Sequence, residues 1–319
     1  MTAGILEKIF DLLLRNKLVG ILMFLAVLGG VSLFAVRSLT AMDINQLISI
    51  GLLRFLPPFG LILLAYLNRL FFWTRVTRSF GLKAPFFLAG KAFFYSILGR
   101  YVPGKAGLFL LRLRAYGGRS KKKVGAAMVT EYIATILAAS LLVLMGSLLA
   151  APADSVLLRW IPIGLAIAAL IALHPGILRR IVNALIKLTG RRQLAEFPTA
   201  GAAASLTFGY MITGLIHGMA LYIILNMFDQ LPFALYPAVT GSYYMAGLIG
   251  IFAFFAPGGL GVREGILFLM LSSYIDTGAV VLGATLMRLL TLIAELFLAG
   301  CFSLAAKWAG YNDSEQEGC

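Results

Sequence analysis

Charged residues are scarce in this chain. Of its 319 residues only 13% are charged and 61% are hydrophobic, and the mean hydropathy is +0.94. A soluble protein of this composition would have too few polar side chains to cover its surface. At about 20 residues per span, there is room for roughly six to nine membrane segments. We therefore expect a single integral membrane domain, residues 1–319, with no appended soluble domain.

Cysteine and histidine are too few for a disulfide framework or a metal centre. The two cysteines are Cys301, in an apolar run, and Cys319, and the C-terminal Gln-Glu-Gly-Cys is not a prenylation box. His174 and His217 lack the Cys, Asp or Glu neighbours of a metal site. We expect no metal, no cofactor and no catalytic residue.

Acidic residues are about half as many as basic ones, 13 against 27, so the net charge is +14. In a soluble protein this excess would suggest a nucleic-acid partner. Here the basic residues gather in stretches at 69–91, 112–123 and 179–192, where they indicate orientation instead. The pattern predicts a multi-pass protein of the cytoplasmic (inner) membrane, with cytoplasmic N and C termini and no nucleic-acid partner.

The apolar runs predict an all-α membrane protein with about six spans. Residues 1–17 are amphipathic and are expected on the cytoplasmic surface. The expected spans are residues 18–36, 47–72 (bent at Pro57-Pro58), 124–150, 156–174, 202–227 and 279–306. The spacing Gly214-x-x-x-Gly218 in the fifth span indicates close helix packing.

Two related breaks interrupt the apolar runs. The first break runs from Gly99 to Gly107 and the second from Pro257 to Gly261. Both contain the pattern Pro-Gly-x-x-Gly, as Pro103-Gly104-Lys105-Ala106-Gly107 and as Pro257-Gly258-Gly259-Leu260-Gly261. Proline removes a backbone donor and glycine frees the backbone, so each break ends one half-helix and begins another. Residues 85–98 are too few to cross ~30 Å as a helix. We expect re-entrant hairpins at about 84–117 and 236–275.

The order span, span, hairpin, span occurs twice, in pseudo-repeats at about 18–150 and 156–308. With three spans in each half, the halves are inverted and the hairpins open to opposite sides, which is a transporter plan. The alternative is that Tyr236 to Phe255 is a full span and that the breaks are ordinary loops. Charge counting does not separate the two readings, because both give the same topology.

Each break is expected to bind an anion. The second half-helix begins inside the membrane, where its unpaired N–H groups and positive dipole end attract phosphate. The candidate substrate-binding residues are Arg100, Tyr101, Pro103, Gly104, Lys105, Gly107, Pro257, Gly258, Gly259, Gly261, Arg263 and Glu264. The alternative is that the glycines only permit tight turns and that the arginines only extend to the membrane surface.

Two acidic residues fall deep within expected spans, Glu131 in the third and Glu295 in the sixth. A charge at that depth costs about 2.5 to 3.5 kcal/mol on insertion scales, so each needs a partner or a water-filled path. Arg288 lies seven residues before Glu295, on roughly the same helical face. Glu131, Arg288 and Glu295 are therefore candidate coupling or ion-pair residues, and the alternative is that they only lock helices together.

Two motifs resemble a known family: Tyr101-Val102-Pro103-Gly104-Lys105, and Pro257-Gly258-Gly259-Leu260-Gly261-Val262-Arg263-Glu264. Over nearly its whole length the chain resembles the lysylphosphatidylglycerol synthase transmembrane (flippase-like) family. That family is similar to the membrane half of multiple-peptide-resistance factors, which make aminoacylated phosphatidylglycerol and move it across the bacterial membrane. The soluble aminoacyl-transferase half is absent here, so the resemblance implies translocation without synthesis.

The leading prediction is flipping or scrambling of a polar, phosphate-containing lipid, with an anionic membrane lipid as the binding partner. A homo-oligomer or a lipid-synthesising enzyme is a further expected partner. The alternatives are a membrane transferase or accessory protein acting on lipid-linked glycans, and a small-solute secondary transporter. Such transferases usually show Asp-x-Asp, a large outer loop or a Ser-Gly-His set, and the sequence has none. A lateral opening between helices would favour a lipid over a solute.

Overall fold

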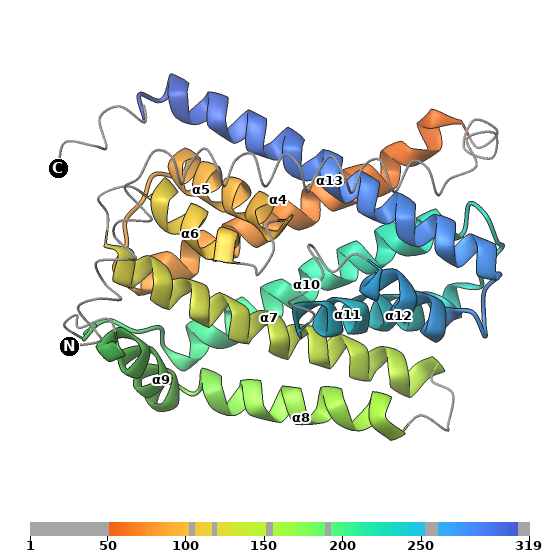
Figure 1. The fold of residues 1–319 in the computed structure, drawn as a ribbon, viewed down its shortest axis with the longest axis horizontal. Helices are drawn as coiled ribbons and strands as arrows, with labels where there is room; N and C mark the ends of the chain where they lie inside the picture. The colour runs from red at the N-terminus through yellow and green to blue at the C-terminus, as the bar shows by residue number, and fades with distance from the viewer. Residues whose placement is uncertain are drawn as a thin grey trace.

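The computed structural model describes residues 51–101, 106–116, 120–150, 156–188, 193–252 and 261–311. Within these ranges the chain is all-helical, built from helices α4 to α13 and short 3-10 helices. Most of the long helices run lengthwise through the molecule, with α8 on one outer face and α4 and α13 crossing on the other (Figure 1). The predicted all-α class is confirmed. The first expected span, 18–36, lies outside the described residues.

Among the residues that the structure describes, four helices are individually long and apolar enough to cross a membrane: α4 (Leu56–Ser79), α7 (Lys121–Ala150), α10 (Ala200–Leu225) and α13 (Thr277–Trp308). A fifth span is possible if α8 (Val156–Leu173) and α9 (Pro175–Leu188) count together. Their outward faces carry exposed large apolar side chains, such as Leu64, Leu170, Phe208 and Phe297. Exposed apolar faces on long helices are what a lipid solvent requires.

The bounds of the second expected span were wrong. The helix begins at Leu56 after the 3-10 helix η1 (Leu52–Phe55), and Pro57 and Pro58 lie in its first turn instead of at a bend. Proline is tolerated there because first-turn N–H groups have no partner inside the helix. At its other end α4 continues to Ser79, beyond the expected end at residue 72, so Arg75 also belongs to the helix.

Both sequence breaks separate short helices that pack against each other. At the first break, α5 (Phe86–Leu98) is followed by η2 (Gly99–Tyr101) and α6 (Ala106–Ala115). A Cβ on Gly99 would lie 2.6 Å from the carbonyl carbon of Gly107, so the two backbones nearly touch.

At the second break, η3 (Phe233–Leu235) leads into α11 (Tyr236–Phe252), and α12 (Val262–Leu271) packs back on α11. The α5–α6 and α11–α12 pairs lie toward opposite ends of the long axis of the molecule (Figure 1). The helix-break-helix prediction therefore agrees with the described bounds. The inverted repeat itself stays a prediction.

Helix α9 replaces the basic loop expected after the fourth span. It begins at Pro175 and is bent by 84° from α8. Leu178, Val182 and Ile186 are buried, whereas Arg179 and Lys187 are exposed. This is the pattern of an amphipathic helix that lies along a surface, with apolar side chains on one face and cations on the other.

Glycines allow the central helices α7, α10 and α11 to approach closely. A Cβ on Gly214 would clash with Leu142 of α7, and one on Gly218 would clash with Thr240 of α11, which confirms the close packing predicted for this pair. Between α7 and α11, a Cβ on Gly146 would lie 2.5 Å from the carbonyl oxygen of Pro237 and 2.9 Å from the Cα of Gly241.

We expect Gly146→Ala to destabilise the protein, because the new methyl group would meet backbone atoms that cannot move aside independently. Overpacking of this kind costs roughly 1 to 3 kcal/mol. Gly125→Ala is the matched control on the same helix, since a Cβ there meets nothing within 4 Å. The melting temperature in detergent should fall for Gly146→Ala and should not fall for Gly125→Ala. Equal melting temperatures would contradict the close contact.

Candidate functional site

Glu131 of α7 lies at the centre of a buried ion-pair cluster. Its carboxylate pairs with Arg112 of α6, and with Arg69 of α4 at 3.2 Å. The side chains of Glu131 and Arg112 are only 1% and 2% exposed. The Arg112 Nε also donates to the Ser96 hydroxyl of α5 at 2.7 Å. Four helices are thereby joined through one carboxylate and one guanidinium.

Aromatic rings enclose the Arg112 guanidinium. Its central carbon lies 4.3 Å from the centre of the Trp73 ring and 4.8 Å from that of Phe93. The Trp73 indole N–H in turn donates to the Tyr116 hydroxyl at 2.8 Å. Ring faces attract a cation without supplying negative charge, so Glu131 remains the neutralising partner of Arg112.

Glu295 of α13 forms the second buried cluster and is 0% exposed. It accepts a hydrogen bond from the Tyr66 hydroxyl of α4, and it pairs with Arg100 at 2.6 Å. Arg100 belongs to η2, within the first sequence break. The break in the first half of the chain is therefore held by a carboxylate from the last long helix of the second half. His217, interpreted as structural from the sequence, packs edge-on against Tyr66.

The start of α12 carries the third cluster, which is formed by Glu264 and Arg288. Gly261 caps this helix with a φ of 78°, a conformation that favours glycine. Glu264 accepts the Gly261 N–H at 2.9 Å and pairs with Arg288 of α13 at 2.7 Å. Arg288 therefore pairs with Glu264 and not with Glu295 of its own helix. Seven helical residues correspond to a rise of about 10.5 Å, so partners on other elements are closer.

Arg263 lies between the two helices of the second break. Its Nε is buried and has no hydrogen-bond partner among the described residues. That atom would lie 2.9 Å from a Cβ on Gly250 of α11, so glycine leaves the space that the side chain occupies. Tyr243, also on α11, stacks on His217, which packs edge-on against Tyr66 of the second cluster. Helix α11 therefore lies against Arg263 through Gly250 and is linked to the second cluster through Tyr243 and His217.

Basic groups outnumber acidic ones across these clusters. In the part of the chain that the structure describes, five arginines face three glutamates: Arg69, Arg100, Arg112, Arg263 and Arg288 against Glu131, Glu264 and Glu295. The described interior therefore carries a net positive charge inside a membrane domain.

The structure brings several of the predicted site residues together and adds others. Arg100, Arg263, Glu264, Glu131, Arg288 and Glu295 all belong to the clusters, and Gly261 caps α12. The backbone of Gly107 lies against Gly99. Outside the described residues lie Pro103, Gly104, Lys105, Pro257, Gly258 and Gly259, together with the side chain of Tyr101.

Sequence reasoning missed Arg69, Arg112 and Tyr66. The two arginines were interpreted as parts of basic flanks that set orientation. A signal was present, because Arg112 lies in an apolar decapeptide, α6, that also forms one arm of the first hairpin. Nothing in the sequence singled out Tyr66 among the twelve tyrosines.

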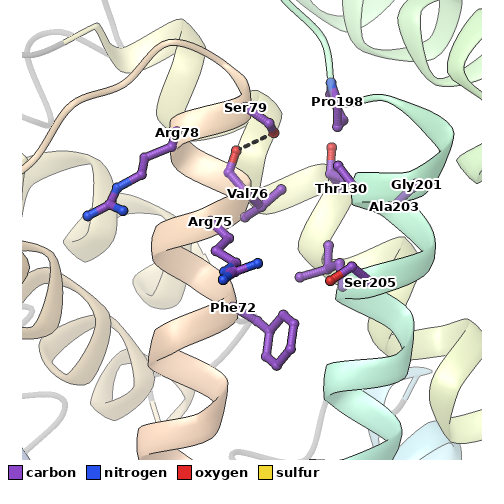
Figure 2. A pocket seen from close by; sticks show the side chains of 12 residues that line it. Phe72, Arg75, Val76, Arg78, Ser79, Thr130, Pro198, Gly201, Ala203 and Ser205 are labelled. Carbon is purple, nitrogen blue, oxygen red and sulfur yellow. Dashed lines mark hydrogen bonds between the residues drawn. The ribbon is translucent and has the colours of Figure 1, made fainter.

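A cavity of about 480 Å³ opens between α4 and α10, close to the first cluster. Figure 2 shows the two helices on either side of it. Its lining residues are Phe72, Arg75, Val76, Arg78, Ser79, Thr130, Pro198, Gly201, Ala202, Ala203, Ser205 and Leu206. The sequence analysis did not predict this cavity.

No protein in the curated collection of sequences matches the chain significantly. A family model described as the lysylphosphatidylglycerol synthase TM region matches residues 16–299, which is most of the chain. The match includes both sequence breaks and every residue of the buried clusters, as the resemblance of the two motifs implied. The chain therefore belongs to the family of the lysylphosphatidylglycerol synthase transmembrane region.

Proposed function

We propose that this protein translocates a polar, phosphate-containing lipid across the cytoplasmic membrane. The proposal rests above all on the excess of arginine over glutamate in the buried clusters. A charged side chain within a membrane is costly and marks a substrate path or binding site. The family also links the chain to lipid metabolism or translocation.

A phosphate group fits this interior chemically. Guanidinium groups bind phosphate through paired N–H donors, and such charge-assisted contacts are about twice as strong as neutral hydrogen bonds. Arg100 and Arg69 are 25% and 29% exposed, so neither side chain is sealed off by its glutamate partner. A phosphate that reaches these groups would neutralise the excess charge while it is bound.

The arrangement of the short helices supports translocation in preference to a fixed binding site. The two hairpins lie toward opposite ends of the molecule (Figure 1). Arg100 lies in the first break, and Arg263 lies in the first turn of α12, directly after the second. In transporters of this plan, broken helices meet near the bilayer midplane and expose the site to each side in turn. The proposed lipid would bind near both breaks, with its acyl chains remaining in the bilayer.

The proposed orientation follows from the ends of the long helices. Basic residues gather where α4 ends and α7 begins, and they continue on α9 and at the end of α13: Arg75, Arg78, Lys83, Lys121, Lys122, Lys123, Arg179, Arg180, Lys187 and Lys307. Figure 1 shows these helix ends at the same end of the molecule. The positive-inside rule then places this end in the cytoplasm.

A head-group-resolved transport assay tests the function. Purified protein is reconstituted into liposomes that contain either labelled phosphatidylglycerol or labelled phosphatidylcholine, and the label in one leaflet is then quenched chemically. We expect the protein to accelerate movement of phosphatidylglycerol more than that of phosphatidylcholine, because its interior is positive. Movement of both lipids at the rate of protein-free liposomes would overturn the proposal.

A further inference from the structure

The cavity between α4 and α10 differs in chemistry from the buried clusters. Its polar lining comes from Arg75, Arg78, Ser79, Thr130 and Ser205, and none of the lining residues that the structure describes is acidic. Small side chains on α10 leave the space open. Within the described residues the cavity is therefore a basic pocket without a carboxylate, whereas Arg69, Arg100, Arg112 and Arg288 are each paired with a glutamate.

Arg75 is the cation best placed to meet a ligand there. Figure 2 shows its guanidinium in the gap between the two helices, whereas Arg78 points away from that gap. The Arg75 side chain is exposed and lies 4.6 Å over the ring of Phe71. No carboxylate pairs with it in the described part of the chain. An anion in the cavity would thus meet an unneutralised guanidinium.

The first turn of α10 strengthens the positive field in the cavity. Pro198, Gly201, Ala202 and Ala203 all line the cavity. The N–H of Ala202 is capped by the Thr199 hydroxyl. The contribution of this turn is therefore the helix dipole, which is positive at this end.

Exposed apolar rings flank the cavity on the outer surface. Phe71 on α4 is 46% exposed and Phe208 on α10 is 63% exposed. Phe71 lies one turn before Arg75, and Phe208 lies nearly one turn after Ser205. A basic pocket beside exposed apolar rings suits a ligand with an anionic head and acyl chains better than it suits a free anion in water.

The cavity also leads toward the buried clusters. Phe72, which lines it, makes an edge contact with Tyr210, and the Arg69 guanidinium lies 5.5 Å over the same Tyr210 ring. Thr130, another lining residue, precedes Glu131 in the chain. The rings of Phe72 and Tyr210 therefore connect the cavity to Arg69 through side-chain contacts.

We propose that this cavity is the first binding site for the phosphate of an anionic glycerophospholipid. The lipid approaches laterally between α4 and α10, from the leaflet at the basic end of the molecule, and Arg75 binds its phosphate. The head group then passes Phe72 and Tyr210 to reach Arg69. This inference rests on the proposed translocation function and assigns that function a lateral access site.

Photo-crosslinking tests the site separately from transport. The probe is phosphatidylglycerol with a photoactivatable group on its head, incorporated in liposomes, and the cross-linked peptides are mapped by mass spectrometry. We expect cross-links on the parts of α4 and α10 that line the cavity. Arg75→Gln should lower their yield about tenfold, as expected for loss of a charge-assisted contact. Gly201→Leu should lower it similarly by filling the cavity, since a Cβ at Gly201 meets nothing within 4 Å.

Matched controls exclude general effects of charge and of added volume. Lys83→Gln removes an exposed cation near the end of α4 that does not line the cavity. Gly60→Leu adds the same side chain to an exposed position of α4 where a Cβ also meets nothing within 4 Å. Both controls should keep the cross-linking yield of the wild-type protein. A yield reduced equally in test and control variants would overturn the site.

A competition experiment distinguishes a lipid phosphate from free phosphate in the cavity. Comparison of cross-linking with transport distinguishes the access site from the translocation function. Excess inorganic phosphate should leave the yield unchanged, and displacement of the lipid by inorganic phosphate would assign the cavity to a free anion and overturn the lipid site. If Arg75→Gln and Gly201→Leu transport and cross-link normally, the access site is wrong although translocation stands. If wild-type protein moves no lipid but both variants lose the cross-link, the site stands and the transport function is wrong.

Discussion

Replacing Glu131 with alanine is expected to lower the free energy of unfolding by about 3 to 5 kcal/mol. The substitution would leave Arg112, 2% exposed, without its carboxylate partner, and would also remove the partner of Arg69. The rings of Trp73 and Phe93 would still face Arg112 but would not neutralise it. The measurement is resistance to unfolding in mixed micelles with increasing fractions of denaturing detergent.

A surface ion pair provides the matched control. Lys123 and Glu196 lie 3.4 Å apart, and the Glu196 side chain is 58% exposed. Exposed ion pairs contribute roughly 0 to 1 kcal/mol to stability, so Glu196→Ala should change the free energy of unfolding only slightly. If Glu131→Ala and Glu196→Ala lowered the free energy of unfolding by similar amounts, water would have to screen the Glu131 cluster. The cluster would then not be the buried link between α4, α6 and α7 that we describe.

Arg100→Gln is expected to reduce lipid movement about tenfold or more, because a charge-assisted contact to phosphate is worth roughly 1.5 to 3 kcal/mol. Glu295→Gln should act differently. Glu295 competes with the lipid phosphate for Arg100, so its neutralisation should tighten lipid binding and slow release. The Tyr66 hydroxyl can still donate to the new amide oxygen. Initial transport rates and equilibrium binding of short-chain phosphatidylglycerol measure the two effects.

The double variant Arg100→Gln with Glu295→Gln separates binding from helix locking. Both groups are then neutral, so neither is left as a charge without a partner inside the protein. If the pair only locks α13 to the first break, the double variant should recover both stability and transport. If Arg100 binds phosphate, stability should recover whereas transport should remain low. Full recovery of transport would therefore contradict a role of Arg100 in the substrate site.

Local sequence patterns predicted the parts of the fold that depend on neighbouring residues in the chain, namely the lengths of apolar helices and the positions of helix breaks. Helices α7, α10 and α13 begin and end within a few residues of the predicted spans. The two Pro-Gly-x-x-Gly patterns predicted where short helices would be interrupted, because proline and glycine act on the backbone itself. The prediction failed for α4, where charge was used to place a boundary. The expected span ended at residue 72, before Arg75, whereas α4 continues to Ser79. Arg69 was counted among the basic flanking residues although it fell within that span, and its carboxylate partner on α7 allows it to lie inside the helix.

The pairing of charges could not be predicted, because it depends on which helices become neighbours. Glu295 was compared with Arg288 on its own helix, but its partner Arg100 is 195 residues away in the chain. For the same reason the cavity was missed, since its walls come from α4, α7 and α10. The sequence did show that buried acids need partners. Tertiary packing alone decides which arginine each acid obtains.

The bend between α8 and α9 has a consequence for the thickness of bilayer that suits this protein. Helix α8 has 18 residues, which at 1.5 Å per residue is about 27 Å, slightly less than a hydrocarbon core of about 30 Å. Because α9 turns away by 84° and presents exposed cations, it cannot sink into the core to lengthen the span. A span shorter than the core can be accommodated by local thinning of the bilayer, and we expect such thinning beside α8. A head group crossing the membrane near this thinned region would have a shorter apolar distance to travel than it has in the undisturbed bilayer.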